Sequence, residues 1–363
     1  MLLFKLALFL EIIMWKGVIP IKKNVVIVLG NGFSIDLINH LNKFDSVDLS
    51  NLFKHGDKVP WPQNKIPGFL SYRNCPELWK IGARPSNDKS TARKIVDDII
   101  TCANVSAITD NPSITTETTN AYILAYHELV VYLRYLFIYY DKLIDDKDIL
   151  ARLGSWGWAQ MFSNLKDNSD IESVTVITYN YDIFLERVLK LLGVDYQLVG
   201  FSSPVKDKFS IIKPHGSISF RSKRLLDREF FSIQYNRDSF GGRIDELEVD
   251  ENVEYDKCSK INTMIPPSGE SERYKYSWSK TLRENAELAI KKIEAEDDII
   301  IGGLSYCSVD RQEIDKIITK LDKSVNIFIA NPDSSNTLVA VISSIFDKYI
   351  HFSSSDTLGG LYK

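Results

Sequence analysis

The sequence predicts an α/β protein built on a doubly wound parallel sheet. Two observations support this fold class. Short β-branched runs alternate with segments whose apolar residues recur at helical spacing, and each strand-like run ends in a glycine or polar turn. Strands that alternate with helices pair in parallel and are buried on both faces. The expected strands are 24–29, 173–178, 196–199, 211–213, 298–301 and 325–330.

The helices follow from the same alternation. The first strand stops at Gly30-Asn31-Gly32 and is followed by a predicted helix at 33–41. The second strand precedes a predicted helix at 181–192, with Gly193 in the position where helices favour glycine. Further helices are predicted at 283–294 and 313–321. Because ligands of such sheets bind beyond the carboxyl ends of the strands, functional residues are expected in the turns that follow them.

Three segments interrupt this pattern. Residues 1–23 contain an apolar run broken by Lys5 and Glu11, which favours a docking helix, or a start misassigned ahead of Met14, over a membrane span or signal peptide. Residues 91–170 predict an aromatic helical insertion, and residues 221–279 a polar one. The core is therefore expected to consist of residues 24–90 and 171–363.

Composition narrows the function classes. The 363 residues carry a net charge of -4, so the chain lacks the basic excess that direct nucleic-acid binding normally needs. Its four cysteines are scattered and form no Cys-x-x-Cys pair, which argues against a zinc ribbon and a disulfide scaffold. We therefore expect a cytoplasmic protein with reduced thiols and no metal.

Two of the turns after strands have side chains suited to binding. In the turn Gly30-Asn31-Gly32-Phe33-Ser34, glycines let the backbone approach a phosphate, and the helix that follows offers unpaired N–H groups. A plain strand-to-helix turn explains that pattern about as well. The turn after the second strand contains Asn180 and Asp182, of which helix capping explains one more easily than both.

A histidine and two further turns complete the set. His215 lies between Pro214 and Gly216, which fix its presentation, and an imidazole is suited to general-base catalysis near neutral pH. The other four histidines have no such pattern. The turns Gly302 to Tyr306 and Asn331 to Asp333 can bind a phosphate and a ribose, although Gly-Gly and Asn-Pro are also common turn dipeptides.

Together these motifs resemble those of the sirtuin superfamily, and more closely its SIR2-like branch in bacterial antiphage defence. The resemblance covers 25–37 (VVIVLGNGFSIDL), 177–186 (ITYNYDIFLE), 213–217 (KPHGS), 300–310 (IIGGLSYCSVD) and 326–333 (NIFIANPD), in the family's order. It implies a Rossmann-like sheet that binds NAD+ and cleaves the bond between nicotinamide and ribose.

The resemblance also implies a role for each matching residue. For catalysis, Asn180 would orient the nicotinamide ribose or a water, Asp182 would hold the carboxamide side of the pocket, and His215 would be the general base. NAD+ binding would use Gly30, Gly32 and Ser34 on a phosphate, Phe33 near the nicotinamide, Asn31 and Asp36 beside them, Gly303 and Ser305 on the adenosine-side phosphate, and Asn331 on the adenine ribose.

Departures from the family pattern refine the expected activity. The chain has no paired-cysteine zinc module, and Gly68 stands where deacylating sirtuins have an aspartate; Asn31 and Tyr179 replace the common alanine and glutamine. These differences favour an NAD+ glycohydrolase that depletes NAD+ in abortive infection. A homo-oligomer and an activating partner, a HerA-type ATPase or an Argonaute-type protein, are implied. The alternatives are a module that senses NAD+ or ADP-ribose without turnover, and a protein deacylase.

Overall fold

The computed structural model describes residues 22–108, 120–201, 207–235, 237–265, 277–304, 311–332 and 337–363. Seven parallel strands form one sheet in the order β11-β10-β9-β1-β2-β4-β3. This confirms the predicted class, a Rossmann-like doubly wound fold. The strands are β1 (Lys23–Leu29), β2 (Ile171–Thr178), β3 (Tyr196–Leu198), β4 (Phe209–Ile212), β9 (Asp298–Gly302), β10 (Asn326–Ala330) and β11 (Tyr349–Phe352).

The centre of the sheet is its most apolar part. All five residues of β9 and the last five of β1 are buried, as expected for β-branched strands covered on both faces. Val25 to Leu29 pair in register with Val174 to Thr178 on one side and with Asp298 to Gly302 on the other. The carboxyl ends of β1, β2 and β9 therefore lie level, and the turns after them meet at one edge.

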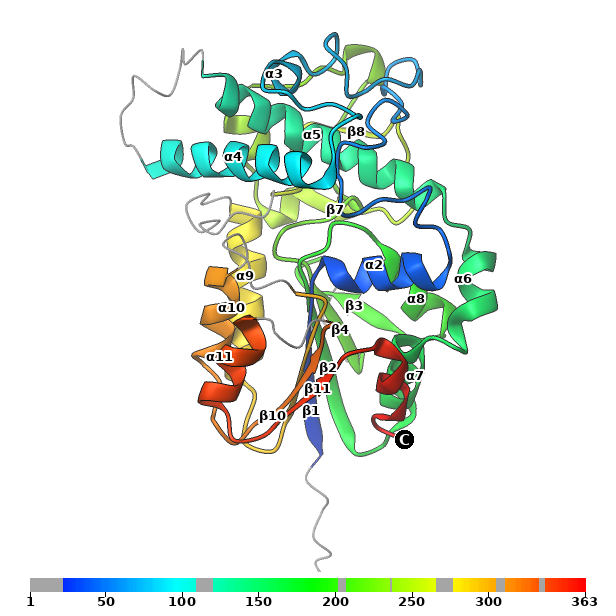
Figure 1. Cartoon of the computed structure of the whole chain (residues 1–363), viewed down its shortest axis with the longest axis vertical. Helices are drawn as coiled ribbons and strands as arrows, with labels where there is room; N and C mark the ends of the chain where they lie inside the picture. The colour runs from blue at the N-terminus through cyan, green and yellow to red at the C-terminus, as the bar shows by residue number, and fades with distance from the viewer. Residues whose placement is uncertain are drawn as a thin grey trace, which may run out of the picture.

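Helices cover both faces of the sheet (Figure 1). One face packs against α9 (Ser277–Lys291), α10 (Arg311–Ile318) and α11 (Thr337–Ile345), through an aliphatic cluster that includes Val26, Ile301 and Ile317. The other face packs against α2 (Asn31–His40), α7 (Gly157–Asp167) and α8 (Phe184–Leu191), with α6 (Asp146–Leu153) beside α8.

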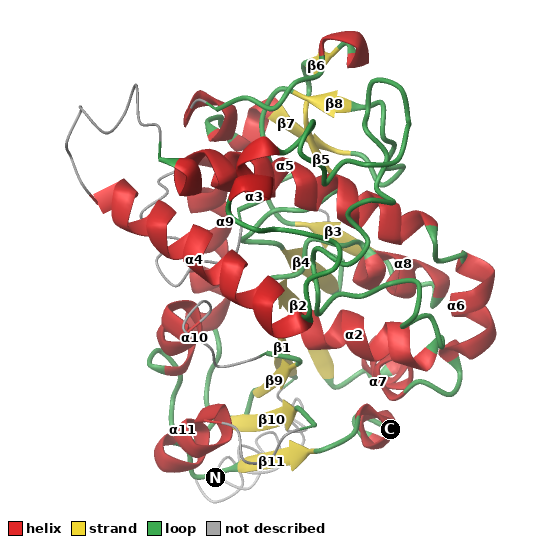
Figure 2. Ribbon diagram, turned by 45° about the horizontal axis from the view of Figure 1, so that its top comes forward, coloured by secondary structure: helices red, strands yellow, loops and turns green. Residues whose placement is uncertain are grey.

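A second layer, which we call the cap, lies over the carboxyl edge of the sheet (Figure 2). It consists of α3 (Pro76–Lys80), α4 (Lys89–Ile108), α5 (Ala121–Lys142) and residues 220–265. Those residues form two small antiparallel sheets, β5 (Phe220–Ser222) with β7 (Leu247–Val249) and β6 (Leu225–Leu226) with β8 (Cys258–Ser259). The 3-10 turns are η2 (Arg228–Phe230), η3 (Arg237–Phe240) and η4 (Ile244–Glu246) in the cap, and η6 (Ser355–Gly360) near the C-terminus.

Helix α5 passes through the middle of the cap. Of the helices in the described ranges, it alone is long and apolar enough to cross a membrane, and 72% of its apolar window is buried inside the protein. Its Tyr135 ring packs against Phe69, from the segment before α3, and against Phe231, from the segment after β5. The aromatic residues of this helix thus form the core of the cap.

The structure places some predicted boundaries differently. Helix α7 lies within the predicted insertion 91–170 but packs on the sheet layer, where its Trp158 and Phe162 rings contact Phe33 of α2. The polar segment 221–279 contributes strands to the cap, and its last residues begin α9. Elements α11 and β11, which complete one end of the sheet, were not predicted. The apolar run before residue 22 lies outside the described residues.

Candidate functional site

The turns after β1 and β9 are in direct backbone contact. Gly30 N–H donates to the Gly302 carbonyl at 3.0 Å, and Gly32 N–H donates to the Gly303 carbonyl at 2.9 Å. A Cβ on Gly32 would lie 2.5 Å from the Gly303 Cα, and Gly303 itself has a φ of +62°. Close approach of the two turns therefore requires these glycines. One amide of the first turn of α2 is already used by this contact.

Beside these turns, Asn180 and Ser34 join the ends of β1 and β2. The two amide hydrogens of Asn180 go to the Gly30 carbonyl and to Ser34 Oγ, each at 3.0 Å. Its Oδ1 accepts no hydrogen bond from the residues that the structure describes. Asn180 is 7% exposed, so this oxygen is the polar atom that it can still offer to a ligand.

Asp182 is buried and fully engaged. Its Oδ2 accepts from Ser34 Oγ at 2.8 Å, and its Oδ1 accepts from the Phe184 amide at 3.1 Å, where α8 begins. Burial raises the pKa of Asp182, and the nearby Lys213 charge and the Ser34 hydrogen bond act against that rise. Asp182 therefore joins the start of α8 to Ser34 of α2. Its predicted role on the carboxamide side of the pocket stays a prediction.

An ion pair lies beneath this network. Lys213, the residue after β4, is 1% exposed, and its Nζ donates to Glu186 Oε1 at 2.6 Å and to the Asp182 carbonyl at 2.5 Å. Burial raises the pKa of Glu186, and the Lys213 charge opposes the rise. The pair fixes the turn after β2 to the end of β4. A lysine that ends an apolar strand was the available signal for it in the sequence.

His215 is the third residue after β4 and is 1% exposed. Its ring centroid is 4.8 Å from that of Tyr179, and its Nε2 is 3.0 Å from Glu313 Oε2 of α10. This carboxylate lies too far off the N–H direction for an aligned hydrogen bond, so the contact is one of charge. On the backbone, the His215 carbonyl accepts from the Ile265 amide at 2.9 Å. The ring is therefore fixed on both sides.

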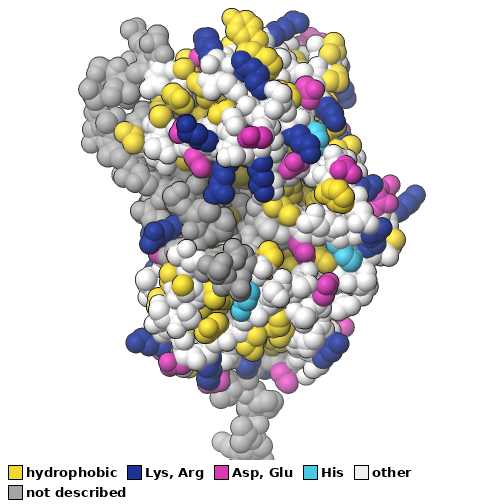
Figure 3. Space-filling view, viewed as in Figure 1, with side chains coloured by type: hydrophobic (Ala, Val, Ile, Leu, Met, Phe, Trp, Pro, Cys, Tyr) yellow, Lys and Arg dark blue, Asp and Glu magenta, His cyan; other side chains and the backbone are white. Residues whose placement is uncertain are grey.

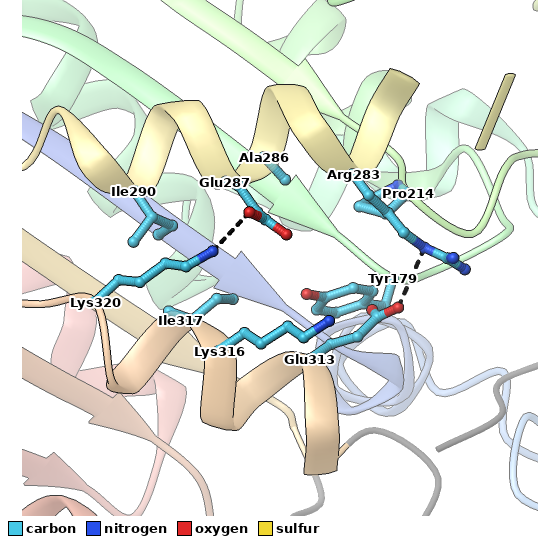
Figure 4. A pocket seen from close by; sticks show the side chains of 10 residues that line it. All are labelled: Tyr179, Pro214, Arg283, Ala286, Glu287, Ile290, Glu313, Lys316, Ile317 and Lys320. Carbon is cyan, nitrogen blue, oxygen red and sulfur yellow. Dashed lines mark hydrogen bonds and ion pairs between the residues drawn. The ribbon is translucent and has the colours of Figure 1, made fainter. Parts of the chain in front are cut away.

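A small pocket opens beside His215, between α9 and α10 (Figure 4). Its volume is about 40 Å³, and Tyr179 and Pro214 line it at the strand ends. Two ion pairs cross it, Arg283 with Glu313 at 3.4 Å and Lys320 with Glu287 at 2.6 Å. At about 10–15 Å³ for each water, it has room for a few water molecules.

Two predicted cofactor-binding residues serve the packing of α2. The Phe33 ring lies 5.3 Å from Trp156 and 5.4 Å from Trp158, between centroids, and its place near a nicotinamide stays a prediction. Asp36 Oδ2 accepts a hydrogen bond from Trp156 Nε1 at 2.8 Å. The sequence favoured a ligand role because both residues follow the glycine turn, but one face of this helix is covered by α7.

The remaining predicted residues lie at the same edge of the sheet. Asn31 is exposed, and its amide donates to the Leu49 carbonyl at 2.9 Å. The Asn331 amide donates to the Leu304 carbonyl at 2.8 Å, which links the turns after β10 and β9. Ser305 lies outside the described residues.

Sequence reasoning missed the charged neighbours of the histidine. Glu313 and Arg283 come from α10 and α9, 98 and 68 positions from His215 along the chain. Nothing in their local sequence distinguishes them from the other charges of amphipathic helices. Within the described ranges, no group of three or more histidines, cysteines, aspartates or glutamates is arranged to hold a metal ion.

The comparisons with known proteins found no relative: no protein-family model matches the chain, and no curated protein matches it significantly. The chemistry of the site is therefore read from its own residues. It combines an amide oxygen available for hydrogen bonding and a buried imidazole beside a carboxylate. These groups can orient a hydroxyl and take up a proton.

Proposed function

We propose that this protein is an NAD+ glycohydrolase, which cleaves NAD+ to nicotinamide and ADP-ribose. The observation that carries the proposal is the convergence of Ser34, Asn180 and His215 at the ends of β1, β2 and β4. These residues come from the three motifs for which the sequence resembles SIR2-like enzymes. In a parallel sheet, this edge is where nucleotides bind.

Hydrolysis of NAD+ needs the protein mainly to position the substrate and the attacking water. Cleavage of the N-glycosidic bond passes through an oxocarbenium-like state, and the bonding electrons leave with nicotinamide as a neutral molecule. Water then adds to the ribose carbon. In this scheme, Asn180 Oδ1 accepts a hydrogen bond from the ribose or the water, and His215 takes the proton that the water loses. The products are nicotinamide, ADP-ribose and one proton.

The enclosure of His215 supports a role for activation. Both of its ring nitrogens are buried and make no hydrogen bond with the described residues. Turnover therefore requires the ring to become accessible. We propose that assembly of the chain, or an activating partner such as a HerA-type ATPase or an Argonaute-type protein, supplies this opening during abortive infection. Free activity would deplete the NAD+ of the host cell.

The test is product analysis with isosteric variants. The full chain, alone and with the product of the neighbouring gene, is incubated with NAD+ while nicotinamide and ADP-ribose are quantified. Asn180→Asp and His215→Gln should reduce product by at least a hundredfold, a usual contribution of acid–base catalysis. His40→Ala is the matched control, because His40 contacts Arg152 at the far end of α2. Equal product from wild type and both site variants would refute the assignment.

The same enclosure favours a second candidate, a module that binds NAD+ or ADP-ribose without turnover. Asn180 has both amide hydrogens bound, and the His215 ring is covered on one side by Tyr179. Calorimetric titration with NAD+ distinguishes the two candidates. Saturable binding with no nicotinamide released, even beside the partner, would favour the sensing module.

A further inference from the structure

We propose that Glu313 of α10 is the positioning residue of His215, setting the charge and the orientation of its ring. This inference rests on the proposed function, in which His215 accepts a proton. It starts from a contact that the sequence motifs do not contain. Glu313 Oε2 lies 3.0 Å from His215 Nε2, and the two side chains are 12% and 2% exposed. No other carboxylate of the described residues forms an ion pair with this ring within 4.0 Å.

The Glu313 carboxylate is itself fixed from the other side. Its Oε1 lies 3.4 Å from Arg283 Nε of α9, and the Arg283 side chain is 14% exposed (Figure 4). Arg283 therefore limits the rotation of the carboxylate and offsets part of its charge. In such a shielded place, the attraction between the carboxylate and a protonated ring is much stronger than in water.

Among the described residues around His215, the other carboxylate that lines the pocket, Glu287, is paired with Lys320. From the turn after β2, the Tyr179 ring packs on the imidazole. From α10, Lys316 lines the same pocket, and on the strand that carries the histidine, Lys213 is paired with Glu186. Glu313 is thus the acidic group placed to favour a positively charged ring.

This arrangement assigns different roles to the two ring nitrogens. Nε2 faces the carboxylate, so in the neutral ring the proton stays on Nε2, the nitrogen near negative charge. Nδ1, which has no hydrogen-bond partner among the described residues, is then the nitrogen that exchanges a proton with water or substrate. The same arrangement stabilises the ring once it has taken up a proton.

The first test reads the ring directly and needs no activity. The full chain is labelled with ¹⁵N-histidine, the His215 signals are assigned with His215→Gln, and long-range ¹H–¹⁵N spectra are followed from pH 5 to pH 9. We expect the Nε2–H form when the ring is neutral. In Glu313→Gln, which preserves shape and removes charge, the share of the Nε2–H form in the neutral ring should fall. An Nδ1–H form in the wild type, or the same tautomer ratio in Glu313→Gln, would overturn the proposal.

The second test is the pH profile of NAD+ hydrolysis. For Glu313→Gln we expect kcat to fall between about tenfold and a hundredfold, which is less than loss of the base itself would cost, and the pH profile of the remaining activity to differ from that of wild type. Asp315→Asn is the matched control, because Asp315 is on the same helix in an exposed pair with Arg311. If Glu313 only joined the helices, Glu313→Gln would unfold at a lower temperature with an unchanged profile.

The two tests keep the inference separate from the proposed function. Should wild type fail to hydrolyse NAD+ with its partner present, the glycohydrolase proposal fails, while the histidine spectra still decide whether Glu313 controls the ring. An altered tautomer ratio in Glu313→Gln without hydrolysis would assign the pair to a binding site. An unchanged tautomer ratio with active enzyme would refute the positioning role alone.

Discussion

Replacing Lys213 by methionine removes the positive half of a fully buried ion pair. Its partner Glu186 is 2% exposed and would retain a negative charge with no counter-charge beside it, and the Asp182 carbonyl would lose its donor. Breaking a buried pair in this way costs about 3–5 kcal/mol. At about 2.1 cal/mol/K per residue, unfolding of 363 residues has an entropy of about 0.8 kcal/mol/K, so the loss corresponds to about 4–6 °C in Tm.

Urea and thermal unfolding of the full chain measure this cost in a double-mutant cycle with Glu186→Gln. The double variant should be at least about 1 kcal/mol more stable than the sum of the single effects predicts, because it leaves no unpaired charge. Lys190→Met is the control: Lys190 is also paired, with Glu251, but at the surface, where the loss is expected to be about 0.2–1 kcal/mol. A Lys213→Met cost near that of the control, or additive effects, would refute the reasoning.

The loss of stability in Lys213→Met should also depend on pH, in a direction that the Glu186 pKa determines. Burial raises the pKa of Glu186 in the folded protein, so the folded state binds more protons than the unfolded state between the two pKa values. The destabilisation by Lys213→Met should therefore be small below about pH 4, where the carboxyl is neutral in both states, and grow as the pH rises. Unfolding curves across this range measure it, and a cost independent of pH would contradict it.

Three further predictions concern the glycine turn and its neighbours. Gly303→Ala should lower the free energy of unfolding by more than about 1–2 kcal/mol, because φ is +62° and the new Cβ would lie 2.3 Å from the Phe33 amide nitrogen. Urea unfolding measures this loss, and an unchanged free energy of unfolding would contradict the close approach of the two turns. Ser34→Ala should cost about 1–3 kcal/mol in the same assay, since Asn180 and Asp182 each lose a buried partner. Phe33→Leu should lower Tm while leaving the affinity for NAD+ unchanged in calorimetry, and a weakened affinity would support the ligand role.

The parts of the fold that were predictable are those fixed by local pattern. The strands β1 and β9 are apolar runs whose ends are marked by glycine, and their predicted ranges differ from the observed ones by one residue. By contrast, β11 has the sequence Tyr-Ile-His-Phe, and its first two residues are exposed at the edge of the sheet. A strand of four residues with little burial has no distinctive pattern, since its order comes from pairing with β10.

The cap was predictable in content and not in arrangement. Helix-spaced aromatics predicted that residues 91–170 are helical, and they fall in α5. Nothing local indicates that Arg134 of this helix donates to the Phe220 carbonyl at 3.0 Å. Arg134 also lies 3.3 Å from Thr263 Oγ1, and Thr263 in turn contacts the backbone of the His215 turn. The two contacts of Arg134 join residues more than 80 positions apart. On the face seen in Figure 3, charges of both signs are interspersed, as the net charge of -4 suggests.

The candidate site also shows why motif residues differ in what their substitution can reveal. One group of motif residues forms hydrogen bonds within the protein, to one another and to the backbone: Ser34, Asp182 and Lys213. Replacing any of them disturbs the structure of the site, whatever its activity. Asn180 and His215 each retain an atom, Oδ1 and Nδ1, that accepts no hydrogen bond from the described residues. Loss of activity in the first group therefore distinguishes no mechanism. Isosteric changes at Asn180 and His215, in variants that unfold like wild type, are the ones that test catalysis.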